Sequence, residues 1–363
     1  MNGKLKIRNL FIFIAIILLL AFCIFMVIKI TNVDKKGSSK NEKITKVETK
    51  KEKIGESPEI KLNGIENMRL VKNSVYEELG ASAKDKEDGD ITKSVKIDNK
   101  VDTTKPGKYV VTYSVTDKDG NTTKLERNVE IFEVEEKDKD TDGISVFMYH
   151  YFYDDKAGET GPDSNYLASS LFEGQLKYLS ENNYYFPTMK EISLYLDGKL
   201  DLPEKSAVLT LDDGAESNYR IAYPLAVKYK VPLVMFVVTS WTDVSMDLQT
   251  EMKNTGYIRF HSHTDDMHQG GCGEQHGALI LCINHEKGVN DLKTSVEKLG
   301  NADALAYPCG DTNDSAVSIV KEAGISLAFT TNYGKIKRGQ DKYRLTRVRI
   351  NDGISLSSYI DSL

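Results

Sequence analysis

Two segments of opposite character open the chain. Residues 10–28 are apolar without interruption and carry no charge, and three cations precede them at Lys4, Lys6 and Arg8. About 20 apolar residues in a helix span the hydrocarbon core of a bilayer. The pattern predicts a single-pass transmembrane helix at 10–28, and the positive-inside rule places residues 1–9 in the cytoplasm.

The residues after this helix are polar. Residues 29–57 are rich in Lys, Glu, Ser and Thr and hold few large apolar side chains, so they cannot bury a core. We expect them to form a flexible stalk that holds the rest of the chain outside the cell, anchored to the cell membrane. A cleaved signal peptide is the alternative, but no small-residue cleavage site follows the apolar segment.

An alternation of polar and apolar residues, typical of β-strands, follows at 58–134. Residues 108–115 alternate with a period of two, and the turn sequence Asp-Gly-Asn at 119–121 precedes a second strand pattern. Several strands without helical periodicity predict a small all-β sandwich. The segment resembles the bacterial immunoglobulin-like domains of cell-surface proteins, in Pro-Gly-Lys-Tyr at 106–109 and Tyr-Ser-Val-Thr-Asp at 113–117. The resemblance implies a spacer or wall-contact role without chemistry.

After a charged linker at 135–142, residues 143–363 follow a different pattern. Continuous apolar runs occur at 144–148, 206–211 and 231–238, as in strands that are buried on both faces of a parallel sheet. Helical periodicity occurs between and after these runs, at 171–180, 219–229, 288–299 and 314–323. The alternation predicts an α/β fold, either a barrel or a doubly wound sheet. Catalytic polar residues are then expected just beyond the C-terminal ends of strands.

Composition narrows the classes of function. The 48 Lys and Arg residues against 54 Asp and Glu residues give a net charge of −6, and no dense basic patch stands out, which argues against a nucleic-acid-binding protein. Four cysteines in 363 residues are too few for a disulfide-stabilised scaffold. Hydrophobic cores must therefore stabilise the chain.

Two acidic residues and a group of histidines are the candidates for chemistry. Asp212 and Asp213 directly follow an apolar run, where burying two carboxylates is costly unless they bind a cation or reach water. One Asp could instead cap the next helix. Three of the six histidines, among them His263 and His268, fall in one short segment. Because imidazole is the commonest metal ligand, we expect Asp213, His263 and His268 to bind a divalent metal and Asp212 to act as a base.

These residues resemble the motifs of a known family, the NodB-type polysaccharide deacetylases of carbohydrate esterase family four. Thr-Leu-Asp-Asp-Gly at 210–214 is similar to the first motif of that family. The spacing of His263 and His268 is similar to that of a circularly permuted subgroup, which contains deacetylases of poly-N-acetylglucosamine and their Gram-positive relatives. The resemblance covers 144–363 and implies a distorted (β/α) barrel.

The resemblance also implies a role for each candidate residue. Asp212 would be the general base, beside the metal ligands Asp213, His263 and His268. In the permuted order, the sequence Val-Phe-Met-Tyr-His that opens the domain supplies the general acid, which makes His150 the candidate.

Two departures from the family pattern change the expected surroundings of the base. Ala-Tyr-Pro-Cys-Gly at 306–310 resembles the third motif, and its Cys309 would stabilise the oxyanion through the backbone N–H. Ala306 stands where many members have an arginine that orients the base, so Arg347 of the closing strand becomes the candidate for that role.

Two cysteines flank an insertion in this domain. Outside the cell, Cys272 and Cys282 could form a disulfide that closes the insertion. The alternative is a second metal site formed by this pair with His276 and His285.

By this resemblance the protein is a metal-dependent hydrolase of amide bonds that removes acetyl groups from N-acetylglucosamine. Zinc is the first candidate metal, and cobalt, nickel and manganese are alternatives, because a mixed nitrogen and oxygen site accepts several metals. We expect cell-wall peptidoglycan as the substrate, because it is the nearest abundant acetamide polymer for an anchored enzyme outside the cell. Poly-N-acetylglucosamine exopolysaccharide is the alternative substrate. Removal of O-acetyl groups and non-catalytic glycan binding are the alternative functions, and no protein partner is evident.

Overall fold

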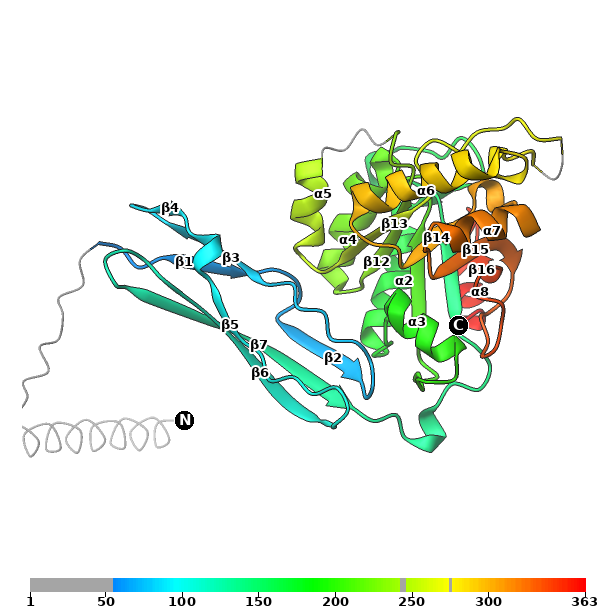
Figure 1. Cartoon of the computed structure of the whole chain (residues 1–363). Coiled ribbons are helices and arrows are strands. Elements are labelled where there is room, and N and C mark those ends of the chain that lie inside the picture. The colour runs from blue at the N-terminus through cyan, green and yellow to red at the C-terminus, as the bar shows by residue number, and fades with distance from the viewer. Residues whose placement is uncertain (1–54, 242–245, 274–275) are drawn as a thin grey trace, which may run out of the picture. The chain divides into compact units, whose positions relative to one another are not determined.

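The computed structural model describes residues 55–363, except 242–245 and 274–275 (Figure 1). The predicted cytoplasmic tail, the transmembrane helix at 10–28 and nearly all of the stalk at 29–57 lie outside the described residues. Within the described part of the chain, no helix is both long enough and apolar enough to cross a membrane.

Two sheets form the β-rich segment that follows. One sheet has the order β1 (Glu59–Leu62), β3 (Ala81–Asp85) and β4 (Gly89–Asp90). The other has the order β2 (Asn67–Val71), β7 (Thr122–Phe132), β6 (Gly107–Thr116) and β5 (Lys96–Asp98). Side chains from both sheets form one apolar core, which confirms the predicted all-β segment. The predicted hairpin is confirmed as well, since β6 and β7 pair antiparallel along their whole length.

Seven parallel strands form a closed barrel in the following segment. Around the barrel they are β8 (Ser145–Tyr149), β11 (Ala207–Leu211), β12 (Leu233–Val237), β13 (Ile258–Ser262), β14 (Ala304–Ala306), β15 (Leu327–Tyr333) and β16 (Leu345–Arg349). β16 pairs with β8 and thereby closes the ring. Every residue of β8, β11 and β12 is buried, as their continuous apolar runs predict. Of the two predicted α/β architectures, the structure has the barrel.

Helices surround this barrel (Figure 1). They are α2 (Ser169–Glu181), α3 (Met189–Leu196), α4 (Tyr223–Tyr229), α5 (Met246–Lys253), α6 (His285–Leu299), α7 (Asp314–Glu322) and α8 (Leu356–Asp361). Four of them were predicted, although the segment predicted at 219–229 begins with a π-helical turn at Asn218–Ala222 before α4. A short parallel pair, β9 (Tyr151–Tyr153) and β10 (Tyr166–Ala168), follows β8.

The strands of the barrel are buried on two sides by two different cores. Along β11, Val208 belongs to one apolar cluster and Leu209 to another, because successive side chains of a strand point to opposite faces. Along β12, Val234 and Met235 divide in the same way. Most of the candidate residues lie where the strands end.

An ion-pair cluster on α2 predicts how the stability of this domain depends on pH. Glu173 accepts hydrogen bonds from Lys156, Lys228 (2.5 Å) and Tyr229 (2.8 Å). The bond from Lys156 is the largest cause that lowers the pKa of Glu173, from 4.5 to about 2. A carboxyl with a lowered pKa stabilises the fold above its ordinary pKa, and this contribution is lost as the pH falls toward about 2.

We expect Glu173→Gln to lower the free energy of unfolding at pH 7 by at most about 1 kcal/mol, because the cluster is partly solvated. The difference from the unsubstituted chain should shrink between pH 4.5 and pH 2. Urea denaturation at several pH values measures it. Glu181→Gln on the same helix is the control, since Glu181 lies 3.9 Å from Lys177 and is 65% exposed. A Glu173→Gln difference that stays constant with pH would contradict the assignment.

Candidate active site

The candidate residues meet at the C-terminal edge of the barrel. His150 follows β8, Asp212 and Asp213 follow β11, and His263 follows β13. These side chains line one cavity of about 360 Å³, together with His268, His276, Tyr307, Cys309, Gly310, Thr331 and Arg349. The C-terminal ends of parallel strands share one edge of a barrel, so residues far apart in sequence come together there.

Three of these side chains form a cluster that could hold a metal ion. Asp213 Oδ1 lies 3.3 Å from His263 Nε2 and 3.4 Å from His268 Nε2. One donor atom from each residue falls within 4.8 Å of the other two. Two imidazoles and one carboxylate are a donor set for zinc and similar divalent metals that leaves positions open for water and substrate. The structure thus brings together the three residues predicted as ligands.

The protonation of the cluster suits a metal. His263 Nδ1 lies 2.7 Å from the carbonyl oxygen of Ala306, which can only accept a hydrogen bond. Nδ1 therefore donates to this carbonyl, and Nε2 is the nitrogen that faces Asp213 and that, without its proton, would bind the metal. Burial by itself would raise the pKa of Asp213, but the hydrogen bond and charge of His263 outweigh burial and hold this pKa well below its usual range. Asp213 is therefore an anion that a cation would stabilise further.

The backbone at the end of β11 is shaped for this arrangement. Asp213 and Gly214 both have left-handed φ angles, of 72° and 73°. A Cβ on Gly214 would lie 2.8 Å from Val237 Cγ1, so the position requires glycine. This left-handed conformation is costly for a non-glycine residue such as Asp213. It turns the backbone between the two residues, so that the carboxylates of Asp212 and Asp213 point to different partners.

The partner of Asp212 is Arg347, which is completely buried. The two side chains form a bidentate pair, with both nitrogen–oxygen distances at 2.7 Å. Burial raises the pKa of Asp212, but the charge and hydrogen bonds of Arg347 outweigh burial and lower it below the ordinary value. Arg347 thus lies against the candidate base.

His150 and Cys309 lie at the same cavity. Burial lowers the pKa of His150 despite the opposing charges of Asp212 and Asp213. Cys309 has a φ of 58° within the turn Pro308–Gly310, and a Cβ on Gly310 would lie 2.2 Å from Thr331 Oγ1. The tight turn places the backbone of Cys309 on the cavity wall. The catalytic roles of His150, Asp212, Arg347 and Cys309 stay predictions.

The predicted disulfide between Cys272 and Cys282 is present. The alternative, a second metal site that uses these two sulfurs, is wrong because the sulfurs are bonded to each other. His285, the fourth member of that alternative, instead contacts Glu322 at 2.8 Å.

Sequence reasoning missed two contacts at the site. Tyr151 donates a hydrogen bond from its hydroxyl to Asp213 Oδ2, and His276 contacts Asp311. The position of Tyr151 directly after His150 was the only local signal for it. His276 was considered only as a metal ligand with the cysteines.

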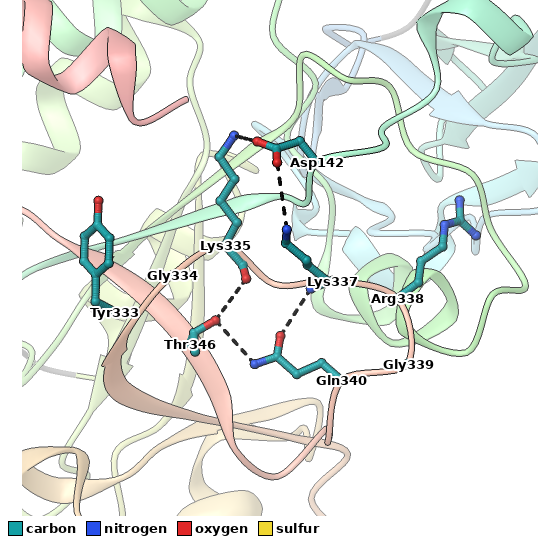
Figure 2. A pocket seen from close by; sticks show the side chains of 9 residues that line it. All are labelled: Asp142, Tyr333, Gly334, Lys335, Lys337, Arg338, Gly339, Gln340 and Thr346. Atoms are coloured by element: carbon teal, nitrogen blue, oxygen red, sulfur yellow. Dashed lines mark hydrogen bonds and ion pairs between the residues drawn. The ribbon is translucent and has the colours of Figure 1, made fainter.

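A second hollow is lined mainly by the loop that connects β15 to β16 (Figure 2). Figure 2 shows Lys335 and Lys337 directed toward the same carboxylate, that of Asp142. Arg338 is also neutralised, because it lies 2.6 Å from Asp201. These pairings leave no free cation among the described residues that line the hollow, and no histidine or cysteine is among them, so we place the chemistry in the cavity at the strand ends.

Comparison with known proteins agrees with this geometry. The family model described as "Polysaccharide deacetylase" matches residues 199–328, and the one described as "Bacterial surface protein, Ig-like domain" matches residues 60–131. The "Poly-beta-1,6-N-acetyl-D-glucosamine N-deacetylase" of Staphylococcus aureus strain MRSA252 is 30% identical over 203 residues, which cover 52% of this chain and 69% of that protein.

Two solved structures share the fold of the barrel domain. IcaB from Ammonifex degensii has 26% sequence identity and a TM-score of 0.52, covering 61% of this chain and 95% of its own. The Streptococcus pyogenes deacetylase PplD, in complex with acetate, has 24% identity and a TM-score of 0.53, covering 61% of this chain and 99% of its own.

A parallel barrel with clustered carboxylates and histidines at its C-terminal edge defines the class, a barrel hydrolase. Within that class, the chain belongs to the polysaccharide deacetylase family and carries an immunoglobulin-like domain upstream. The family predicted from the motifs is therefore confirmed.

The buried pair of Arg347 and Asp212 gives a prediction about stability. Arg347→Met leaves a buried carboxylate without a cation, which we expect to lower the free energy of unfolding by about 3–5 kcal/mol. The double variant Asp212→Leu with Arg347→Met removes both charges and should recover much of this loss.

Urea denaturation of the full chain measures all these variants. Arg344→Met is the matched control, because Arg344 is 37% exposed and its ion pairs should contribute less than about 1 kcal/mol. If Arg347→Met is as stable as Arg344→Met, the buried pair does not constrain the barrel as described.

The hydrogen bond from Tyr151 predicts an effect on metal affinity. Tyr151→Phe removes a hydrogen bond that orients Asp213, so zinc affinity should fall about 10- to 100-fold while the fold is kept. Competition with a chromophoric chelator measures the affinity. Tyr166→Phe is the control, since the ring of Tyr166 stacks 4.8 Å from that of Tyr151. Equal zinc affinities in the two variants would refute the role of Tyr151.

Proposed function

We propose that this protein removes acetyl groups from N-acetylglucosamine units of a β-1,6-linked polymer. The observation that carries the proposal is the cluster of Asp213, His263 and His268 beside a second carboxylate, Asp212, with its own cationic partner. The S. aureus relative supports the choice of glycan, because its name states the β-1,6-linked polymer. The comparisons thus favour the exopolysaccharide that we held as the alternative over the peptidoglycan that we expected.

A divalent metal fits the site, and Asp213, His263 and His268 would hold it. When bound, such a metal lowers the pKa of a water molecule and polarises the carbonyl of the acetamide. Zinc is our first candidate, because the donor set is two imidazoles and one carboxylate. Tyr151 would keep Asp213 oriented by the hydrogen bond to its second oxygen.

Asp212 is suited to take the proton from the attacking water. Arg347 keeps this carboxylate ionised, so it can accept a proton at neutral pH. The same pairing lowers its basicity, so proton transfer to Asp212 requires water that has become more acidic than bulk water. The two neighbouring carboxylates therefore have different tasks: Asp213 would hold the metal, and Asp212 would accept the proton.

His150 lies in the same cavity and would protonate the departing amine. An amide requires this step more than an ester does, because an amine leaves poorly without a proton. The backbone N–H of Cys309, in the tight turn on the cavity wall, would donate a hydrogen bond to the carbonyl oxygen as it gains negative charge.

We also propose that the protein acts at the cell membrane, with the barrel outside the cell. The apolar segment 10–28 and the cations before it support this location. The match of residues 60–131 to a domain of bacterial surface proteins and the disulfide between Cys272 and Cys282 agree with it. An extracellular glycan would then be the partner.

Activity measurements test the proposed roles. We expect Asp212→Asn and His150→Ala each to reduce acetate release from β-1,6-linked N-acetylglucosamine oligomers by about 10²- to 10⁴-fold. Both variants should keep their zinc, measured by mass spectrometry, whereas Asp213→Asn should lose it. Circular dichroism monitors folding, because Asp212→Asn leaves the charge of Arg347 without its partner.

Parallel assays on purified peptidoglycan and on an O-acetylated glycan separate the alternatives. Faster acetate release from peptidoglycan than from the β-1,6-linked oligomers would overturn the proposed substrate. Wild-type rates of amide hydrolysis in both Asp212→Asn and His150→Ala would overturn the mechanism. Ester hydrolysis that is unchanged in His150→Ala, without amide hydrolysis by the wild type, would identify an O-acetyl esterase.

A further inference from the structure

A disulfide-closed loop brings an exposed histidine to the wall of the active-site cavity. The loop runs from Cys272 to Cys282, which are bonded to each other. From its first residue, the N–H of Cys272 donates to the carbonyl of Gly277 at 3.0 Å. A Cβ on Gly277 would lie 2.4 Å from the carbonyl oxygen of Cys272, so this turn requires glycine. His276 stands next to that turn and lines the cavity.

A buried carboxylate orients this exposed ring. Asp311 is 1% exposed, and its Oδ2 accepts hydrogen bonds from the backbone N–H groups of His276 and Ala278, both at 3.1 Å. Its Oδ1 lies 2.7 Å from His276 Nδ1. An ionised carboxylate can only accept, so Nδ1 carries the proton. The other ring nitrogen, Nε2, is therefore the one left for a ligand.

The backbone bonds to Asp311 would be sufficient to hold the loop in place. The additional bond to the ring fixes the orientation of a side chain that is 69% exposed, which a purely structural loop does not need. Ordering an exposed side chain costs conformational entropy. The ordered ring beside the candidate metal ligands is thus suited to contact a substrate.

We infer that His276 Nε2 accepts a hydrogen bond from a hydroxyl of the sugar next to the one that loses its acetyl group. This inference rests on the proposed function, and it makes His276 part of a subsite for the neighbouring sugar of the glycan. In its neutral form, an imidazole with a protonated Nδ1 offers one acceptor, and sugar hydroxyls are donors that a neutral polymer presents on every unit. No catalytic step requires His276, so its effect should be on binding.

The subsite is linked to the reacting centre through a short segment of backbone. Asp311 follows directly after the turn Pro308–Gly310, which holds the backbone of Cys309 on the cavity wall. The group that would contact the carbonyl oxygen and the carboxylate that orients His276 are therefore two residues apart. This short connection fixes the spacing between the acetamide and the contact to the next sugar.

The chain contains its own reporter for a binding experiment. Trp241 is the only tryptophan of the sequence, it is 47% exposed, and its ring lies 5.0 Å from that of His268. Its fluorescence should change when a sugar enters the cavity. Binding can then be measured in the zinc-loaded full chain with His150→Ala as background, in which turnover is slow and the pair of Asp212 and Arg347 is kept.

The test is a fluorescence titration with β-1,6-linked N-acetylglucosamine oligomers of one to five units. In this background, His276→Ala should weaken the affinity for the pentamer about tenfold, as expected for one lost hydrogen bond, and change the affinity for the single sugar far less. His276→Gln places an amide near the position of Nε2 and should retain most of the affinity. His285→Ala is the matched control, because His285 contacts Glu322 outside the cavity, and it should bind as the background does.

Two outcomes would overturn the subsite. Pentamer binding by His276→Ala that equals the background would do so, and so would an equal loss of affinity at every oligomer length. If the wild-type chain deacetylates these oligomers and His276→Ala binds them normally, only the subsite fails. If the wild type neither binds nor deacetylates them, the proposed function fails first and the subsite with it.

Discussion

The buried salt bridge between Arg347 and Asp212 constrains the whole active-site end of the barrel. Arg347 comes from β16 and donates to the carbonyl oxygen of Thr330 in the middle of β15, to Thr210 of β11 and to the carboxylate of Asp212. A buried guanidinium is tolerated only when its hydrogen-bonding groups find partners. These contacts connect β16 to β11, which are far apart in sequence. The positive charge of Arg347 is therefore compensated only when the barrel is closed.

This constraint also separates the tasks of two adjacent carboxylates. Asp212 is directed to Arg347 inside the barrel, whereas the left-handed backbone at Asp213 turns the next carboxylate to His263 and His268. Two anions side by side would each raise the pKa of the other, but here each has a cationic or potentially cationic partner of its own. The sequence Asp-Asp-Gly thus acts as one local unit, with the glycine making room for Val237.

Much of the fold can be predicted from local sequence patterns. The elements that could not be predicted are short or depend on distant partners. The apolar runs predicted β8, β11 and β12, because each is a continuous buried strand. α3 has only eight residues and begins with a capping box between Thr188 and Glu191, while β14 has three residues, so neither offers enough periodicity for a prediction.

The residues of the candidate site also divide into those that a local sequence pattern identifies and those that it does not. Asp212, Asp213, His263 and His268 stand out locally, because carboxylates after an apolar run and clustered histidines are unusual. The place of Arg347 against the base came from a family resemblance, since its partner is 135 residues away. The contacts of Tyr151 with Asp213, 62 residues away, and of His276 with Asp311, 35 residues away, could not be inferred from any local pattern.

The cavity is thus built from two kinds of elements, the strand ends of the barrel and a loop closed by a disulfide. The groups for chemistry stand on strand ends, where the closed barrel and the pair of Asp212 and Arg347 fix their positions. The wall formed by the 272–282 loop is held separately, by a disulfide and by the carboxylate of Asp311. The second half of this loop also packs on the barrel, because Ala278 and Ile280 share an apolar cluster with Leu305 of β14 and Ala328 of β15. The groups proposed for the chemistry and the histidine proposed to contact the next sugar therefore stand on different elements of the same domain.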